Sequence, residues 1–385
     1  YQTLWAAVAA AFFLISLGLA AVYFSSSPPV AEPIRFTVNQ PAGTSIRPLS
    51  PSVSPDGRHI MFTSNWRIHL RPIDSTEVRV LNGPEAVIHP FWSPDSRRIG
   101  YGTFGSRTLS LADIDGSPPQ TLCELPGPFT GASWSKEGVI LAGVANGGLY
   151  QVSLSGGDPV AVTGLDKSRG EYEHRLPHFL PDGNHFVYTV ASTNNAIAGV
   201  YVSSLDSKET RRLLHFHSEA KYAPPYCLLY LRNDTLMAQR FDLDNLELSE
   251  EPVSIAQGIS QTQSLTTTSF SVSLNGVLAY VSGEMPAANL SWINRRGARL
   301  GSVGEAKRYR QVALSPDEKQ VVAQVMSNEE PSKLWVLDLE RGGVATRLNF
   351  NSSREGDAVW SPDGRVIAFS SFHRDSTANI YKKAL

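Results

Sequence analysis

The chain has 385 residues, of which 42% are hydrophobic and only 18% charged, and its formal net charge is −2. An average globular domain has about 25% charged residues, and no basic run occurs here, so nucleic acid is not expected as a partner. The 30 glycines and 25 prolines are spaced as turn residues between many short strands.

An uncharged apolar segment occupies residues 4–24. It is about long enough to cross a bilayer as a helix, and Trp5 and Tyr23 lie near its ends, where aromatic rings favour the membrane interface. A cleaved signal peptide is the alternative, but the apolar run exceeds the usual ~7–15 residues and no basic segment precedes it. The sequence therefore predicts a transmembrane helix in residues 1–24, of which residues 4–24 lie in the membrane. No Lys or Arg flanks this helix before Arg35, so its orientation stays open.

A short polar, proline-rich segment follows in residues 25–33 (SSSPPVAEP). Such a composition predicts a semi-rigid stalk rather than a packed element. Residues 34–38 (IRFTV) then alternate like a strand but have no hairpin partner of their own.

From about residue 50 the chain repeats one unit, a Ser-Pro-Asp-Gly type of turn between two apolar strands. Pro presets φ at the second turn position, Asp can accept hydrogen bonds from its own backbone, and Gly tolerates a positive φ. The close copies of this turn carry Asp56, Asp95, Asp182, Asp317 and Asp363. Weaker copies at residues 134–138, 222–226 and 271–276 bring the number to eight.

The spacing of the turns predicts the architecture. Asp56 to Asp95 spans 39 residues, Asp95 to Glu137 spans 42, and Glu137 to Asp182 spans 45. A period of about 40–45 residues with four short strands per unit is typical of a β-propeller blade. We therefore expect an all-β fold, a propeller of seven or eight four-stranded blades, in residues 34–385. The last repeat lacks an outer strand, so it is either truncated or closed by strand 34–38.

Each repeat reads as an inner strand, the turn, a second strand, a third strand and an outer strand. The second strands are expected at 59–64, 99–104, 139–144, 185–190, 277–282 and 321–326. The third strands are expected at 68–74, 109–115, 149–154, 200–205 and 334–339. The outer strands are expected at 78–81, 120–123, 160–163 and 211–214. Trp92, Trp134 and Trp360 directly precede the turns, and we expect these large rings to pack between neighbouring blades.

The Pro-Asp turns resemble those of the TolB-like, WD-repeat-like propellers of bacterial envelope proteins, over about residues 50–385. Phrases such as Phe179-Leu-Pro-Asp-Gly183, together with the order of apolar helix, stalk, Arg35-Phe36-Thr37 and propeller, are similar to the C-terminal part of bacterial membrane-anchored serine/threonine protein kinases. This resemblance implies a single-pass membrane protein with an extracytoplasmic (periplasmic) propeller and a kinase domain upstream of it.

No catalytic set is evident in the chain itself. The kinase motifs are absent apart from His373-Arg374-Asp375, where Asn379 follows Asp375 by four positions rather than the required five. No Gly-x-Ser-x-Gly elbow and no phosphate-binding Gly-x-x-x-x-Gly-Lys occurs. We expect no catalytic residue and no cofactor in this chain. The two cysteines, Cys123 and Cys227, fall in different repeats and are expected to be small buried side chains rather than a disulfide.

Two groups of residues contain side chains of the kinds that bind metal ions. The segment Glu171-Tyr-Glu-His-Arg-Leu-Pro-His178 holds carboxylates and histidines, but their spacing matches no standard zinc site. The aspartate pairs that could serve Ca²⁺ match only part of the calcium-loop pattern, and they are Asp113, Asp115, Asp242 and Asp244. We expect no metal.

What is left is a binding surface on the loop face of the propeller. Aromatic residues and arginines are favoured in binding hot spots, and the candidate contacts with a protein or small ligand are Trp66, Arg67, Tyr172, Arg175 and Arg374. The leading hypothesis is a non-catalytic, membrane-tethered, extracytoplasmic binding propeller, the sensor region of a serine/threonine protein kinase. The alternatives are a TolB-like envelope scaffold and the propeller of a peptidase or hydrolase.

Overall fold

The computed structural model describes residues 51–83, 86–259, 270–281, 287–327, 331–349, 354–372 and 378–385, together with Trp5 and Ser16. Residues 1–42 form one unit of the chain and Gly43–Leu385 form the other. The predicted stalk 25–33 and strand 34–38 lie outside the described residues, as do residues 4–24 apart from Trp5 and Ser16. Within the described ranges, no helix has both the length and the apolar character needed to cross a bilayer.

Five four-stranded antiparallel sheets follow one another from residue 52 onward, each with its strands side by side in chain order. Sheet 1 comprises β1 (Ser52–Val53), β2 (His59–Ser64), β3 (Arg67–Pro72) and β4 (Arg79–Val80). Sheet 2 comprises β5 (Val87–Trp92), β6 (Arg98–Thr103), β7 (Thr108–Asp113) and β8 (Gln120–Glu124). Sheet 3 comprises β9 (Phe129–Trp134), β10 (Val139–Val144), β11 (Leu149–Ser153) and β12 (Val160–Ala161).

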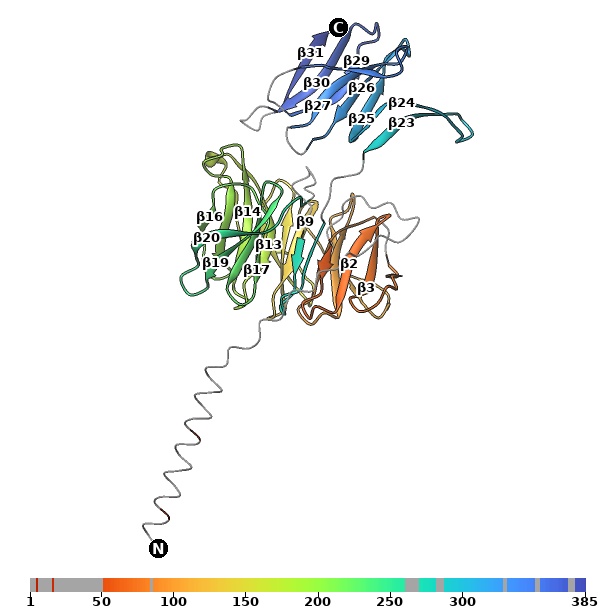
Figure 1. Cartoon of the computed structure of the whole chain (residues 1–385). Coiled ribbons are helices and arrows are strands. Elements are labelled where there is room, and N and C mark those ends of the chain that lie inside the picture. The colour runs from red at the N-terminus through yellow and green to blue at the C-terminus, as the bar shows by residue number, and fades with distance from the viewer. Residues whose placement is uncertain are drawn as a thin grey trace. The chain divides into compact units, whose positions relative to one another are not determined.

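A short 3-10 helix, η1 (Lys167–Arg169), leads into sheet 4. Sheet 4 comprises β13 (Glu171–Phe179), β14 (His185–Ser192), β15 (Gly199–Ser204) and β16 (Arg211–Leu214). Sheet 5 comprises β17 (Ala220–Ala223), β18 (Cys227–Arg232), β19 (Thr235–Asp242) and β20 (Glu247–Ala256). In Figure 1 the strands β2 and β3 are orange, and the strands from β14 to β20 run through green.

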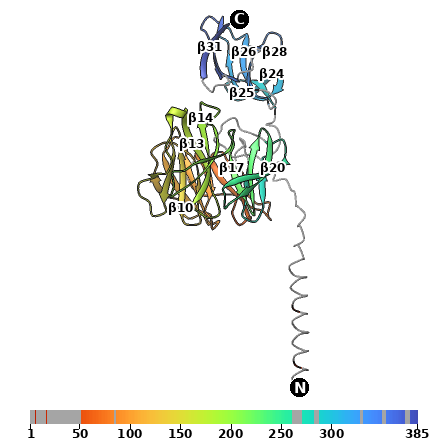
Figure 2. The same ribbon diagram turned by 90° about the vertical axis from the view of Figure 1, so that its left-hand side faces the viewer.

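The sixth repeat is divided into two hairpins. One is sheet 6, with β21 (Phe270–Val272) and β22 (Leu278–Tyr280), and the other pairs β23 (Ala288–Ile293) with β24 (Arg299–Lys307). Sheet 7 comprises β25 (Tyr309–Leu314), β26 (Gln320–Val325), β27 (Lys333–Asp338) and β28 (Val344–Arg347). Sheet 8 comprises β29 (Arg354–Trp360), β30 (Val366–Phe372) and β31 (Ala378–Ala384). Figure 2 shows the strands from a second direction.

These sheets confirm an all-β fold of repeated four-stranded antiparallel sheets, the architecture of a β-propeller. Each of the eight predicted turns joins the first two strands of a sheet, and the predicted second strands at 59–64 and 139–144 have the observed bounds. The other predicted strands agree to within a few residues. Alternating strand faces and turn residues at a fixed period were therefore sufficient to locate the elements.

Sheets 1 to 6 contact one another in a closed cycle. The last contact of the cycle joins sheet 6 back to sheet 1, where the Val53 amide donates to Ser271 Oγ at 3.0 Å. Hydrogen bonds between other neighbours run from Trp92 Nε1 to the Ser52 carbonyl (3.2 Å), from the Phe179 amide to Ser133 Oγ (3.0 Å), from Thr189 Oγ1 to the Ser218 carbonyl (2.6 Å) and from Lys221 Nζ to the Phe270 carbonyl (2.8 Å).

The hydrophobic core lies between the faces of neighbouring sheets. Trp92 of sheet 2 packs with Met61 and Leu70 of sheet 1, and Trp134 of sheet 3 packs with Phe91 of sheet 2. Trp360 packs in the same way on the cluster between sheets 7 and 8, and its Nε1 donates to the Ala313 carbonyl at 3.0 Å. The prediction that these tryptophans pack between blades is confirmed.

Candidate functional site

In each four-stranded sheet, the turn between the second and third strands lies at the same end as the start of the inner strand, because the strands are antiparallel. Hydrogen bonds between neighbouring repeats hold these ends together. The Val87 amide donates to the Trp66 carbonyl at 2.9 Å, and the His174 amide donates to the Gly147 carbonyl at 2.9 Å. We call this end of the sheets the Trp66 face. The Asp turns lie at the opposite end.

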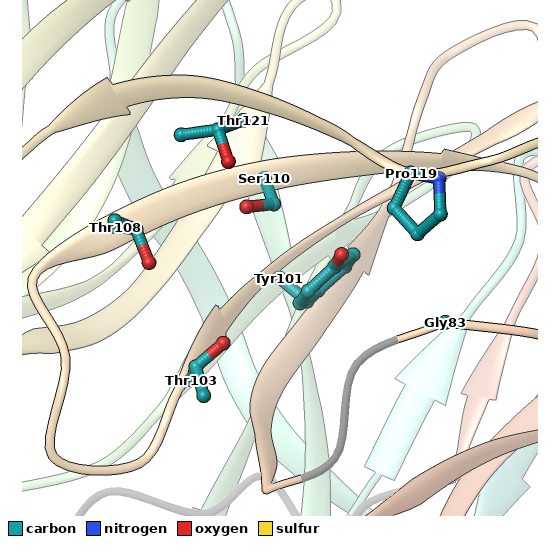
Figure 3. Close-up of a pocket in the computed structure, with 7 residues that line it drawn as sticks. All are labelled: Gly83, Tyr101, Thr103, Thr108, Ser110, Pro119 and Thr121. Atoms are coloured by element: carbon teal, nitrogen blue, oxygen red, sulfur yellow. The ribbon is translucent and has the colours of Figure 1, made fainter.

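A pocket of about 380 Å³ opens on sheet 2, beside the β6–β7 turn of the Trp66 face. Figure 3 shows the residues that line it. They are Gly83, Tyr101, Thr103, Thr108, Ser110, Pro119 and Thr121.

The pocket is lined by hydroxyl groups. Tyr101 lies opposite Ser110 on the neighbouring strand, and Ser110 lies opposite Thr121, so three hydroxyl side chains form one row across β6, β7 and β8. Burial raises the pKa of Tyr101, although the hydrogen bond with Ser110 opposes this shift, so the phenol stays protonated. No lining residue is charged. The pocket can therefore exchange hydrogen bonds with a neutral polar ligand but cannot neutralise an ion.

A second feature of the site is a β-bulge that recurs in the inner strands. The register shifts in β5, β9, β13 and β29, each time beside a residue with positive φ three positions before the aromatic residue that ends the strand. These residues are His89 (47°), Gly131 (123°), Leu176 (52°) and Asp357 (50°). Bulges redirect the side chains next to them and are common beside functional sites.

Next to the bulge of β13, a set of titratable side chains on sheets 4 and 5 forms what we call the β13–β17 cluster. It consists of Glu171, Glu173, His174, Arg175, His178, His217, Glu219 and Lys221. Charged groups are seldom buried unless they are paired, and perturbed charged groups gather at functional sites.

The first part of the cluster is satisfied by hydrogen bonds. His174 Nε2 lies 3.3 Å from Glu171 Oε2, and His174 Nδ1 lies 2.8 Å from Thr163 Oγ1. Thr163 Oγ1 also accepts a 2.9 Å hydrogen bond from the Leu149 amide. Burial lowers the pKa of His174, and the negative charge of Glu171 opposes that shift.

The second part is the ion pair of Arg175 and Glu173, in which two nitrogen atoms of Arg175 have no hydrogen-bond partner among the described residues. Arg175 Nη1 lies 3.4 Å from Glu173 Oε1, and Glu173 Oε2 accepts from the Asn146 amide at 3.3 Å. Arg175 is only 4% exposed. Its Nε and Nη2 have no hydrogen-bond partner in the part of the chain that the structure describes.

The third part connects sheets 4, 5 and 6. Lys221 Nζ lies 2.9 Å from Glu219 Oε1, and burial raises the pKa of Glu219 against the effect of this ammonium group. His178 forms a hydrogen bond with the backbone of Tyr222. Burial, together with the positive charge of Lys221, lowers the pKa of His178 to about 3. Burial also lowers the pKa of His217 to about 4, with a contribution from the positive charge of Arg175. Both histidines are therefore neutral at pH 7.

The five predicted contact residues do not form one patch. Trp66 is 47% exposed, and its ring lies 5.4 Å from that of Phe104, while the adjacent Arg67 is also exposed. Tyr172 is half-buried and Arg175 is buried, and both belong to β13, three sheets further around the cycle. Arg374 lies outside the described residues.

The predicted turn aspartates bind their own turns. Asp56, Asp95, Asp317 and Asp363 each accept hydrogen bonds from a serine two residues earlier and from the amide two residues later. Asp182 accepts instead from the amides of Asn184 and His185, because Leu180 stands where the others have serine.

No group of three or more His, Cys, Asp or Glu side chains in the described ranges could hold a metal ion. Cys123 and Cys227 are free thiols, each half-buried.

Sequence reasoning missed the hydroxyl pocket and the acid–base pair of Glu219 and Lys221. A signal for the pocket was present in Tyr101-x-Thr103 and Thr108-x-Ser110, where hydroxyl residues alternate on one face of two successive strands. The other face of the second strand holds Leu109 and Leu111. The pair Glu219 and Lys221 occupies the repeat whose turn motif is nearly erased, so it was not aligned with the other inner strands.

No protein-family model and no curated protein matches this sequence. Among solved structures, the chain is similar to the Cps50 (Swd1) β-propeller domain of Myceliophteria thermophila, with 12% identity, a TM-score of 0.43, and coverage of 88% of this chain and 98% of that one. It is also similar to the propeller of Dos1, with 10% identity, a TM-score of 0.40, and coverage of 83% and 88%. An oligogalacturonate lyase of Vibrio parahaemolyticus has 10% identity, a TM-score of 0.40, and coverage of 87% and 89%. These likenesses concern the fold alone.

Proposed function

We propose that this chain is a non-catalytic binding propeller that holds a small, neutral, polyhydroxylated ligand on sheet 2. The observation that carries this proposal is the gathering of five hydroxyl side chains in one pocket whose lining includes no charged group. Hydroxyl groups both donate and accept hydrogen bonds, so this lining complements a sugar or polyol better than an ion or an apolar molecule. The exposed rings of Trp66 and Phe104 near the same face offer an aromatic surface to a larger ligand or a protein.

Saturation-transfer NMR with a panel of neutral mono- and disaccharides tests this proposal. We expect signal from at least one sugar, and we expect it to weaken in T108V and T121V, which remove a hydroxyl group while keeping the shape of the side chain. Thr121 is exposed on an outer strand, and Thr346 is exposed on the outer strand β28, so T346V is a matched control. Transfer to no sugar, or equal transfer in all the variants, would contradict the pocket assignment.

We also propose that the propeller is tethered outside the membrane by residues 4–24 and serves as the sensor region of a serine/threonine protein kinase. The apolar composition of that segment and the resemblance of the repeats support this role. The reading frame upstream of Tyr1 tests the kinase assignment, because a complete set of strand lysine, catalytic Asp and Asn, and Asp-Phe-Gly is required. Alkaline phosphatase fused after Leu385 tests the orientation, and an inactive fusion would place the propeller inside.

A ring of seven or eight blades is the finer proposal for the fold, and it requires the contact that joins sheet 6 to sheet 1 to open so that sheets 7 and 8 can enter the ring. Large apolar side chains of β23–β31 are exposed and would be covered in such a ring, and they include Trp292, Leu300, Val312, Leu314 and Val359. Small-angle scattering of residues 43–385 tests it. A single compact ring of this size has a radius of gyration of about 20 Å, and a markedly larger value would count against it.

A further inference from the structure

The guanidinium group of Arg175 has an unusual bonding state for a buried charge. Nη1 faces Glu173, whereas Nε and Nη2 have no acceptor among the described residues, although only 4% of the residue is exposed. Burying a donor without a partner costs free energy, and the cost is larger when the donor carries charge. An acceptor placed at Nε and Nη2 of Arg175 would remove this cost.

The geometry of the free donors indicates the kind of acceptor. Nε–H and Nη2–H lie along one edge of the planar guanidinium group and point in parallel, which matches the two oxygens of a carboxylate. Of the other donors, one on Nη1 is used by Glu173. A single carbonyl or hydroxyl oxygen would satisfy only half of this edge, whereas a carboxylate satisfies both donors.

Unpartnered polar atoms on the neighbouring repeats lie near this arginine. Thr130 Oγ1 of β9 is buried and without a partner. A Cβ atom at Gly143 would lie 2.7 Å from Thr130 Oγ1 and 3.5 Å from Arg175 Cα, so the Thr130 hydroxyl group lies near the backbone of Arg175. His217 Nδ1, just before β17, is also buried and unpartnered. Three successive repeats thus contribute unpartnered buried polar atoms, two from inner strands and one from the segment that leads into an inner strand.

We propose that Arg175 binds a carboxylate through its Nε/Nη2 edge, with the Thr130 hydroxyl group as a further donor to it. The site is distinct from the hydroxyl pocket on sheet 2 and does not depend on it. Glu173 orients the guanidinium group through Nη1 and is itself held by the Asn146 amide. The carboxylate belongs to a small free acid or to the end of a peptide, and both sources share this chemistry.

Thermal unfolding of the full chain at constant ionic strength tests the proposal, with sodium acetate replacing sodium chloride. Binding to the folded state alone raises the unfolding temperature progressively with ligand concentration. We expect this rise for the wild type, and a loss of apparent acetate affinity of tenfold or more in R175K, which keeps the charge but not the paired donors. The exposed Arg169, which pairs with Glu171 at 3.8 Å, provides the matched control R169K.

A second variant and a direct signal keep the test decisive if R175K folds poorly. T130V retains the arginine and should weaken acetate binding, and the Arg175 Nε–H resonance should shift when acetate is added to the wild type. A short peptide with a free C-terminus, compared with its amidated form, separates the two sources of the carboxylate. Equal unfolding temperatures in acetate and chloride, or an acetate response in R175K and T130V equal to that of the wild type, would overturn the proposal.

Discussion

Ser93 Oγ donates a 2.6 Å hydrogen bond to Asp95 Oδ1, and the same oxygen of Asp95 accepts from the Arg97 amide at 3.1 Å. Ser93 Oγ in turn accepts from the Arg98 amide at 2.8 Å, so two side chains close the whole turn. The full arrangement recurs in sheets 1, 7 and 8. Sheet 6 has Asn275 in place of the aspartate, and its Oδ1 accepts from Ser273 Oγ at 2.5 Å.

The first prediction concerns this turn. D95A removes the acceptor of two hydrogen bonds and should lower the free energy of unfolding by about 1 kcal/mol. D95N keeps an acceptor oxygen in place, as Asn275 does in sheet 6, and should cost less. Urea unfolding at pH 7 measures both variants, and equal losses would show that the charge of Asp95, rather than its bonding geometry, holds the turn.

Gly148 provides the second prediction, because a side chain cannot be placed there. A Cβ atom at this position would lie 2.0 Å from the carbonyl oxygen of Thr163, and that backbone oxygen cannot move aside without disturbing β11 and the segment beside it. We expect G148A to destabilise the protein by roughly 1–3 kcal/mol. The exposed Gly164 has nothing within 4 Å of the same Cβ position, so G164A is the control, and a loss as large as that of G148A would argue against a steric cause.

Thr163 provides the third prediction, since its hydroxyl group joins sheet 3 to the β13–β17 cluster. T163V leaves both His174 Nδ1 and the Leu149 amide without their partner and should cost about 1–3 kcal/mol. T163S retains the hydroxyl group and should recover most of this loss. The midpoint temperature of thermal unfolding, measured for both variants and the wild type, tests this prediction. Equal midpoints for T163V and the wild type would show that water replaces the hydroxyl group.

The fourth prediction concerns pH. Burial lowers the pKa of His89 to about 4, that of His217 to about 4 and that of His178 to about 3, below the 6.5 of an ordinary histidine. Between pH 6.5 and about 4 the unfolded chain binds protons that the folded chain does not, so stability should fall as the pH falls. Burial raises the pKa of Glu219, and this group has the opposite effect on stability. Its contribution makes the folded protein less stable as the pH rises above the ordinary pKa of a glutamate, because the unfolded chain then releases a proton that the folded chain keeps.

The variant H178Q isolates one part of this pH dependence. We expect its stability to fall less steeply than that of the wild type between pH 6.5 and 4.5, by about one proton in the linkage slope. The exposed His215 makes H215Q the comparison variant. An unchanged slope in H178Q would mean that His178 takes up its proton in the folded state as readily as in the unfolded state.

The repeats could be predicted because their turns depend on local chemistry. Pro, Asp and Gly act through their own backbone, and the residue at the last turn position has a positive φ of 71° at Gly57 and 70° at Gly364, as the motif requires. Ser96 and Glu318 adopt the same conformation without being glycine. The hairpin holds them there, which explains why weaker copies of the motif still fold alike.

The site was harder to predict because it depends on which residues meet across strands and repeats. Arg175 was predicted to contact a partner on the loop face, because arginine is favoured in binding hot spots. It is buried instead, next to the bulge at Leu176 and in contact with Glu173. The hydroxyl pocket depends on the register that places Tyr101 opposite Ser110. A shift of one residue would turn these side chains to the other face of the sheet.

The recurring bulge has a consequence for stoichiometry. Four residues directly precede the positive-φ residue of a bulge, yet one is apolar, one neutral and polar, one cationic and one without a side chain. They are Ile88, Thr130, Arg175 and Gly356. The backbone conformation repeats from one sheet to another, whereas the side chains at this position do not. A ligand that is recognised by one of these side chains therefore binds to a single repeat. Such a ligand binds once per chain, however many times the backbone motif is repeated.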